Sequence, residues 1–333
     1  MTREAAGGPA PGTVPEGLSI RAPAAEDLAG IVALMRACEL AEHGEAEAEA
    51  DDLLGDWQRS GFDPARDAWL VAGPEGEIAG YADVWARDEF RQFNCAGYVQ
   101  PRRCGSGIGV RLLRLMEERA RDLTARAPSD GRVALNNIVS HTNERARRLL
   151  EENGYRPLRY YWRMVIKMEE PPPPPPWPEG ITVRTFVRGR DERPVYAAVQ
   201  EAFADNKGFV PTSFEDWSNF MIERETFDPA LWFLAMDGDE VAGVALCPSY
   251  PGSGWVRQVA VRRRWRRRGI ALALLLQAFG EFYRRGKREV GLVVDSYNLS
   301  GARDLYERAG MRMERRHDAY EKEIRPARRE RSD

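Results

Sequence analysis

The sequence of 333 residues has few of the residues that hold metals or form disulfides. It contains three histidines and four scattered cysteines (Cys38, Cys95, Cys104 and Cys247), and no two cysteines form a CxxC pair. Neither a zinc-ligand spacing nor a disulfide framework is therefore expected. A reducing, cytoplasmic setting without a bound metal is the simpler prediction.

Long apolar runs are also missing. There is no stretch of 18 apolar residues, and the N-terminal segment MTREAAGGPAPGTVPEG lacks an apolar core. We therefore expect neither a membrane span nor a secretory signal. The net charge is only −3 although 30% of the residues are charged, so the basic character typical of a nucleic-acid-binding protein is absent. Nothing in the sequence indicates an oligomeric state.

What the sequence does contain is a long internal repeat. Ile181-Thr-Val-Arg parallels Leu18-Ser-Ile-Arg, Glu240-Val-Ala-Gly parallels Glu77-Ile-Ala-Gly, and Gly310-Met parallels Gly154-Tyr. A repeat of about 160 residues is a duplicated domain rather than a solenoid period. We predict a tail over 1–17, one domain over 18–169, a linker over 170–179, a second domain over 180–325, and a tail over 326–333.

Six consecutive prolines, Pro171–Pro176, stand between the two copies. Polyproline is extended and stiff, so this segment is interpreted as a spacer. A ligand for an SH3-type domain is the functional alternative.

The second copy contains a pattern suited to phosphate. Val259-Ala260-Val261 is predicted to be a strand, and a helix is predicted to open at Gly269, within Arg266-x-x-Gly269-x-Ala271. A helix N-terminus offers unpaired N–H donors to an anion, and small residues allow close approach. Arginine grips phosphate through two donors, and six arginines lie between positions 262 and 268.

These residues resemble the acetyl-CoA loop of the GNAT acyltransferases. A second match lies downstream, where Asn298 opens a helix and Tyr306 precedes Gly310 by four residues. The resemblance implies two tandem GNAT folds of the α/β (α+β) class. Each would have a mixed, mostly antiparallel sheet flanked by helices, with a splayed V between its central strands. The implied activity is an acetyl-CoA-dependent N-acetyltransferase acting on an amine.

The resemblance also implies roles for residues of the second copy. The strand Val259-Ala260-Val261 would pair with the pantetheine arm and polarise the thioester carbonyl through a backbone N–H. Asn298 and Ala302 would contact CoA, and Tyr306, beside the same arm, would protonate the leaving thiolate. The loop and first helical turn would hold the pyrophosphate through Arg266, Arg267, Arg268, Gly269, Ile270, Ala271 and Leu272.

Two of these roles have structural alternatives. Tyr306 lies on an amphipathic helix and is also suited to core packing. Asp295, at the end of a predicted strand, is a candidate base for the amine, directly or through water. It is equally suited to a solvated strand end or a helix cap. Arg262–Arg264 would meet either the adenosine phosphate or solvent.

The first copy differs where the chemistry would sit. Leu150 occupies the place of Tyr306, and Cys104 that of Arg266. The glycines Gly105, Gly107 and Gly109 remain, and Val99 matches Val261. We predict a catalytically silent half that still holds an acyl-CoA, with a purely structural half as the alternative. Cys104 is interpreted as a substitution in a decayed site rather than a redox centre.

The acceptor is not fixed by the sequence. Tandem halves of which only the second is fully equipped are similar to the mycothiol synthases, which acetylate a cysteinyl amine, but Trp255 stands where those enzymes have an acidic residue. Another small amine or a protein N-terminus remain alternatives. A non-catalytic acyl-CoA sensor is the competing class. Five aromatic residues would either line an apolar acceptor pocket or simply pack in the core: Phe209, Trp217, Phe220, Phe227 and Trp232. Acidic residues that include Asp205 would either bind a cationic acceptor or form a solvated face.

Overall fold

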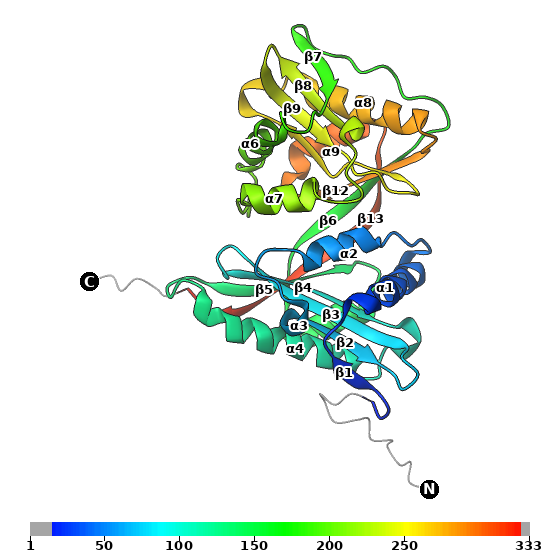
Figure 1. Cartoon of the computed structure of the whole chain (residues 1–333), viewed down its shortest axis with the longest axis vertical. Helices are drawn as coiled ribbons and strands as arrows, with labels where there is room; N and C mark the ends of the chain where they lie inside the picture. The colour runs from blue at the N-terminus through cyan, green and yellow to red at the C-terminus, as the bar shows by residue number, and fades with distance from the viewer. Residues whose placement is uncertain (1–14, 328–333) are drawn as a thin grey trace, which may run out of the picture. The chain divides into compact units, whose positions relative to one another are not determined.

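The computed structural model describes residues 15–327, without the side chains of residues 298–303. Most of the two predicted tails therefore lies outside the described residues. The chain divides into two compact units: unit 1 is Met1–Leu158 with Asp318–Asp333, and unit 2 is Arg159–His317 (Figure 1). Each unit holds one copy of the repeat. None of the described helices has the length and apolar character needed to cross a membrane.

Unit 1 is a mixed sheet with helices on both faces. Its strands are β1 (Ser19–Arg21), β2 (Ala68–Ala72), β3 (Ile78–Arg87), β4 (Gln92–Val99) and β5 (Val133–Ser140), in spatial order. Its helices are α1 (Leu28–His43), α2 (Ala50–Trp57), α3 (Pro64–Asp67), α4 (Ile108–Leu123) and α5 (Glu144–Glu152). Helix α4 packs with one core on one face, and α1 with α2 covers a second core on the other.

Unit 2 repeats this plan with its strands in two sheets. One sheet has the order β11 (Gln258–Val261), β9 (Glu240–Leu246), β8 (Trp232–Asp237) and β7 (Ile181–Thr185). The other includes β10 (Gly254–Trp255) and β12 (Glu289–Asp295). The helices are α6 (Glu192–Phe203), α7 (Phe214–Met221), α8 (Ile270–Arg284) and α9 (Leu299–Arg308). Helix α8 belongs to one core, and α6 with α7 covers the other.

The limits of the units fall inside two long strands, β6 (Arg156–Lys167) and β13 (Arg312–Arg325). The sequence predicted β6 in the first domain and β13 in the second. Instead, Tyr161–Lys167 of β6 pair with β12 inside unit 2. The end of β13 belongs to unit 1, where Arg132 Nε donates to Glu323 Oε2 at 2.7 Å. The compact units therefore depart from the predicted boundaries by one strand segment at each end.

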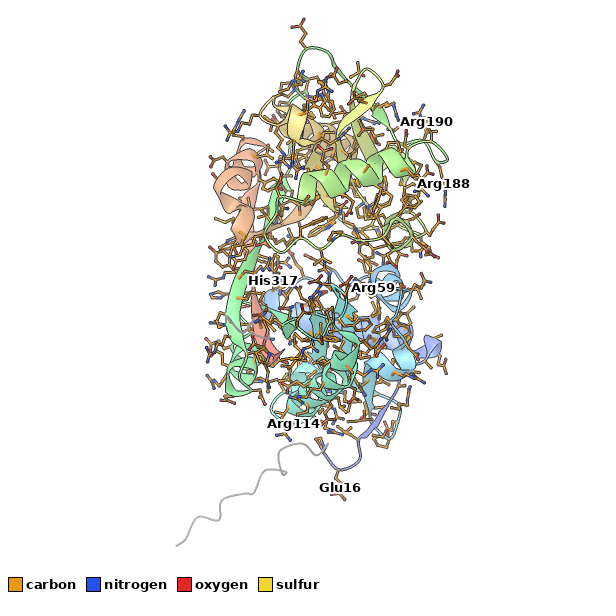
Figure 2. The ribbon with its side chains drawn as sticks, turned by 90° about the vertical axis from the view of Figure 1, so that its left-hand side faces the viewer. Glu16, Arg59, Arg114, Arg188, Arg190 and His317 are labelled. Atoms are coloured by element: carbon orange, nitrogen blue, oxygen red, sulfur yellow. The ribbon has the colours of Figure 1, made fainter. Side chains whose placement is uncertain are left out.

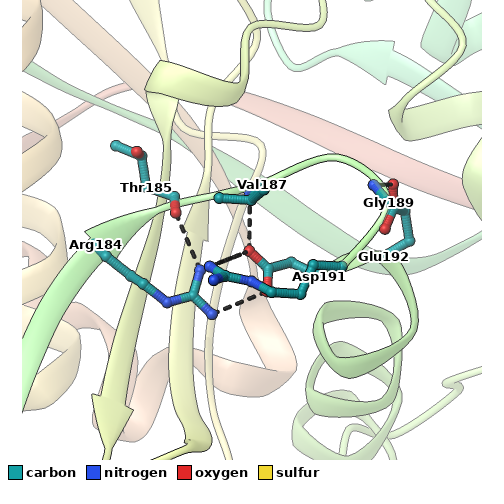
Figure 3. A network of polar contacts seen from close by, with 7 residues as sticks. Arg184, Thr185, Val187, Gly189, Asp191 and Glu192 are labelled. Atoms are coloured by element: carbon teal, nitrogen blue, oxygen red, sulfur yellow. Dashed lines mark hydrogen bonds and ion pairs between the residues drawn. The ribbon is translucent and has the colours of Figure 1, made fainter.

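An arginine–aspartate clasp holds the first strand to the first helix in both units. In unit 2, Arg184 donates to both oxygens of Asp191 at 2.6 and 2.9 Å, and Val187 N–H donates to the same carboxylate (Figure 3). Arg188 and Arg190 lie in the same turn (Figure 2). The donors hold the pKa of Asp191 down at about 2, although burial opposes them.

Unit 1 repeats the clasp, since Arg21 donates to both oxygens of Asp27 at 2.6 and 2.7 Å. The parallel confirms that the two sequence copies fold alike at this point. The acidic, alanine-rich sequence from Ala41 to Asp52 predicts continued helix, and this prediction was wrong in part, because α2 begins only at Ala50. Helix α1 ends before Gly44, whose φ of 78° breaks the helix.

Candidate functional site

In unit 2, the strands that precede and follow α8, β11 and β12, do not pair with each other and lie in different sheets. Strand β10 pairs in parallel with β12 at Gly254 and Trp255, and Val256 N–H still donates to Gly291 O at 2.9 Å. The next strand, β11, pairs with β9 in the other sheet. The predicted V between the central strands is therefore present, and it opens after Val256. In unit 1, β4 pairs with β5 only over Gln92–Cys95, so the same opening follows Cys95.

A β-bulge stands at the mouth of this opening. Arg257 N–H donates to Leu246 O at 3.0 Å, and Gln258 is also opposite Leu246, so two residues face one. Further along β11, Arg262 N–H donates to Ala242 O at 3.0 Å. Because antiparallel bonding alternates, the N–H groups of Val259 and Val261 point away from β9. No strand among the described residues pairs with that edge of β11, which leaves donors suited to a ligand.

The loop after β11 curls into an anion-binding shape. Arg267 and Gly269 have positive φ angles of 62° and 87°, and α8 begins at Ile270. Successive N–H groups in such a turn, followed by the first turn of a helix, form a concavity that attracts anions. Ile270 is buried in the core, and Leu272 packs against the same core. Ile270, Ala271 and Leu272 thus present backbone N–H groups while Ile270 and Leu272 anchor the helix.

Most of the arginine run is bound to carboxylates of unit 2. Arg262 pairs with Glu201 at 2.6 Å, Arg264 with Glu240 at 3.5 Å and Arg268 with Asp237 at 3.8 Å, while Asp205 takes both Arg263 and Arg266 at 2.5 and 2.8 Å. These two guanidinium groups lower the pKa of Asp205. Among residues 15–327, only Arg267 of the run has no hydrogen bond or ion pair with another side chain or the backbone.

The arginine run is therefore not a common patch of unpaired cations, and the phosphate contacts expected of Arg266–Arg268 stay a prediction. Five of the arginines hold the loop to its neighbours, and Arg267 is left with its charge directed to solvent. Asp205, one of the acidic residues considered for a cationic acceptor or a solvated face, pairs with Arg263 and Arg266 of the loop. The sequence did not reveal this pairing, because the carboxylates come from separate parts of the chain: Glu201, Asp205, Asp237 and Glu240.

Tyr306 lies on α9, which packs against α8 and β12. Its ring is half buried against the core that Val259, Val261 and Leu272 also contact, so the structure gathers these four predicted site residues. Burial raises the pKa of Tyr306 to about 12. Its hydroxyl has no hydrogen-bond partner within the described part of the chain. Asn298 and Ala302, the other predicted site residues of this segment, have side chains outside the described residues.

Asp295 is engaged at the end of β12. Arg159 Nη1 donates to Asp295 Oδ2 at 2.8 Å, and Tyr297 N–H donates to Asp295 Oδ1 at 2.9 Å. These contacts match the alternative in which Asp295 closes the turn after the strand. In unit 1, Ser140 occupies the same place and its hydroxyl lies 2.9 Å from that of Thr142.

The corresponding loop of unit 1 has the same backbone shape with different side chains. Gly105 and Gly107 have φ angles of 90° and 91°. Gly109 lies close to α5, since a Cβ there would be 3.2 Å from Leu149. Leu150, in the place of Tyr306, is buried. Unit 1 therefore retains the anion-binding turn and lacks the hydroxyl.

Two thiols of unit 1 lie at the carbonyl group of Val99, at the end of β4. Val99 O accepts from Cys38 Sγ at 3.3 Å and from Cys104 Sγ at 3.9 Å. Asn143, the counterpart of Asn298, accepts from Ala146 N–H at the start of α5 and donates to Glu42. The carbonyl that would pair with a pantetheine amide thus already has donors.

The five aromatic residues considered for an acceptor pocket or for the core do not all line one cavity. A small cavity of about 10 Å³ is lined by Phe220, Phe227 and Trp232 together with Arg224 and Arg257. Trp217 is buried in the core under α6 and α7, and Phe209 does not line this cavity. No group of three potential metal-ligating side chains occurs in the described residues.

The model of the acetyltransferase (GNAT) family matches residues 30–155 and 164–311, which is most of the chain. The chain belongs to the GNAT family. The two matched segments coincide with the two repeats, and the fold is a tandem of two GNAT units. A GCN5-related N-acetyltransferase from Sphaerobacter thermophilus is 44% identical, with a TM-score of 0.80, over 95% of this chain and 98% of that one.

Two further comparisons fit this tandem GNAT architecture. A tandem GNAT protein from the clavulanic acid biosynthesis pathway has a TM-score of 0.71 at 16% identity, over 93% of this chain and all of that one, and shows the fold alone. The mycothiol acetyltransferase of Saccharopolyspora erythraea is 29% identical over 74% of this chain and 82% of its own length, and that of Thermomonospora curvata is 32% identical over 72% and 77%. The chain is therefore an acyltransferase that resembles mycothiol synthase in architecture.

Proposed function

We propose that unit 2 transfers an acetyl group from acetyl-CoA to a primary amine of a small molecule, by direct attack in a ternary complex. The observation that carries this proposal is the grouping of the splayed strand β11, the anion-binding turn before α8 and Tyr306 around one core. Acetyl-CoA supplies the activated acetyl thioester.

The backbone of unit 2 would hold and polarise that thioester. The N–H groups of Val259 and Val261 are directed away from β9 and are placed to pair with the pantetheine arm and to donate to the carbonyl oxygen. Such fixed donors stabilise the oxyanion that develops during acyl transfer. The N–H groups of residues 269–272 would bind the pyrophosphate, with Arg267 supplying the cation. Arg266 and Arg268 would support the loop through Asp205 and Asp237.

Tyr306 is the proposed general acid. The amine nitrogen forms a bond to the carbonyl carbon, the carbon–sulfur bond breaks, and the Tyr306 hydroxyl gives its proton to the sulfur. The proton lost by the amine passes to water or a base. A pKa of about 12 keeps the phenol protonated at neutral pH, as an acid requires. Asn298 and Ala302 are proposed to contact the CoA arm.

Unit 1 is proposed to be catalytically silent and to hold an acyl-CoA through Val99, Gly105, Gly107 and Gly109. The retained turn supports binding, whereas the thiols on Val99 O support the structural alternative. Native mass spectrometry with acetyl-CoA distinguishes them. Two molecules bound per chain are expected, and a stoichiometry limited to one would leave unit 1 a structural role.

The acceptor class rests on the relatives and on Trp255. The names of the relatives suggest the cysteinyl amine of a mycothiol precursor, but the ring of Trp255 covers Gly291 and Arg163 stands 5.7 Å from its centroid. No carboxylate occupies that position for an amine, so another small amine or a protein N-terminus is the alternative acceptor. A cytoplasmic location stays a prediction from cysteine usage.

The test is release of CoA thiol from acetyl-CoA against a panel of amines, with Tyr306→Phe run beside the wild type. Amine-dependent release that is lost in the variant is the expected result. Tight acetyl-CoA binding without release for any amine, a mycothiol precursor included, would favour a non-catalytic acyl-CoA sensor.

A further inference from the structure

The proline-rich linker lies on unit 2 rather than bridging open space. Figure 1 traces the connection from β6 to β7 past the outer side of α8. Residues 170–179 belong entirely to unit 2. The segment is therefore part of the same body as the proposed acetyl-CoA loop.

The burial of the prolines has a period of three. Pro172, Pro175 and Pro178 are half buried, whereas Pro171, Pro173, Pro174 and Pro176 are exposed. A polyproline II helix has three residues per turn, so one row of its side chains rests on the protein. A spacer that served only to separate two units would have no reason to bury one row.

Both ends of the segment are fastened to α8 or to its loop. At the first end, Met168 N–H donates to Arg288 O at 2.8 Å, and the hydroxyl of Tyr283 on α8 donates to Glu169 O at 3.3 Å. Near the other end, Trp177 packs against the core that contains α8. Beyond it, Arg268 Nη2 in the loop donates to Glu179 O at 3.4 Å.

Arg268 joins this segment to the floor of the loop. Its second nitrogen, Nη1, lies 3.8 Å from Asp237, and the same carboxylate accepts from Trp265 Nε1 at 2.8 Å. Trp265 is almost fully buried. The turn between β11 and α8 is thus held from inside by Trp265 and Asp237, and from outside by Glu179 through Arg268.

The composition of the segment suits this task. Tyr283 and Arg268 are separated by about 22 Å along a helix that rises 1.5 Å per residue. The ten residue-to-residue steps from Glu169 to Glu179 would span on average only about 17 Å as a flexible chain, and about 31 Å as polyproline II. Proline therefore keeps the segment extended enough to reach both ends of α8 before it docks.

We propose that residues 170–179 form a strap that clamps α8 and positions the acetyl-CoA loop through Glu179 and Arg268. The residues act by positioning and do not touch the reacting atoms. The effect on kinetics rests on the proposed function of that loop, but the clamping itself does not. A loop held in its binding conformation loses less entropy when the ligand arrives.

Two double variants test the strap. Each replaces two prolines that are three positions apart, so the two variants lose the same number of prolines at the same spacing. Pro172→Ser with Pro175→Ser removes the half-buried row, and Pro171→Ser with Pro174→Ser removes exposed prolines only. We expect the first to raise KM for acetyl-CoA about three- to tenfold with kcat within about twofold, and the second to leave both unchanged. Equal behaviour of the two pairs would overturn the strap in favour of a spacer whose stiffness alone matters.

A second readout needs no ligand and no activity. Hydrogen exchange of the backbone amides of residues 265–272 should be faster in the Pro172/Pro175 variant and unchanged in the Pro171/Pro174 variant. If the wild type fails to bind acetyl-CoA, the proposed function fails while this comparison still decides the strap. Unchanged exchange in both variants would refute it.

Discussion

The loops that precede α4 in unit 1 and α8 in unit 2 have nearly the same backbone conformation but differ in their side chains. Positive φ angles recur at Gly105 and Gly107 in unit 1 and at Arg267 and Gly269 in unit 2. At the first of these positions unit 1 has Gly105, which adopts a left-handed conformation without strain. Unit 2 has Arg267 there, for which this conformation is unfavourable. The turn is therefore common to both units, whereas a cation at its first left-handed position is found only in unit 2.

On the other face of the sheets, it is unit 1 that carries the polar side chains and unit 2 that is apolar. In unit 1, Trp57 Nε1 donates to the Tyr81 hydroxyl at 2.9 Å, which donates to buried Asp83 at 2.8 Å. In unit 2 the places of Tyr81 and Asp83 hold Val244 and Leu246, both buried. The unit with Leu150 in the place of Tyr306 therefore carries the buried carboxylate, and the unit with Tyr306 has an apolar layer there. Exchanging individual residues between the copies tests which differences matter.

The largest expected effect comes from Tyr306→Phe. It removes the hydroxyl that unit 1 lacks and keeps the ring that packs on the core, so kcat should fall about 10- to 100-fold with little change in KM for acetyl-CoA. Steady-state assay of CoA thiol release with a saturating amine measures this. An undiminished kcat would assign Tyr306 to packing alone. Leu150→Phe is the matched ring control in unit 1, with turnover expected to stay at the wild-type level.

Arg267→Gly gives unit 2 the loop residue of unit 1. Loss of the cation should raise KM for acetyl-CoA about five- to tenfold, because a charge-assisted contact to phosphate is lost. Relief of the left-handed backbone at position 267 should stabilise the fold slightly. Arg264→Gly is the control, since Arg264 pairs with Glu240, and its KM should change less than about twofold. A larger effect at 264 than at 267 would reverse the assignment.

Asp83→Asn tests the buried carboxylate of unit 1. Burial raises the pKa of Asp83 to about 7, so the folded protein keeps it protonated where the unfolded chain has lost the proton. Wild-type stability should therefore fall as the pH rises from about 4 to 7, and the variant should lack this slope. Relative to wild type, the variant should gain about 2–4 kcal/mol between pH 4 and pH 8. Urea unfolding at both pH values measures this, and parallel pH profiles would contradict it.

The smallest effect is expected for Asp295→Ser, which introduces the residue found in unit 1. If Asp295 only closes the turn with Tyr297 and pairs with Arg159, kcat should stay within about threefold of wild type. A base role predicts a larger loss of kcat that shrinks as the pH rises, because the amine then deprotonates unaided. The pH profile of kcat from 6.5 to 9.5 separates the two.

Local sequence signals predicted the elements of each unit well. The Val-x-Val strand, the glycine turn and the helix after it occur at β11 and α8 because each signal depends on neighbours in the chain. The helix expected from Ala41 began late because Gly44 ends α1, and that glycine was visible in the sequence. The ion pair between Asp295 and Arg159 could not be predicted from such local signals, since Arg159 is distant in the chain.

The sequence by itself determined the duplication, the GNAT turn in each half, and the loss of the tyrosine at Leu150. Each follows from residue type at fixed spacing. Only the tertiary structure decided that β6 pairs with β12, that five arginines of the run are neutralised, and that the prolines lie along α8. Strand partners, ion pairs and docked segments depend on side chains brought together from distant parts of the chain. Their free energy comes from contacts that no local pattern specifies.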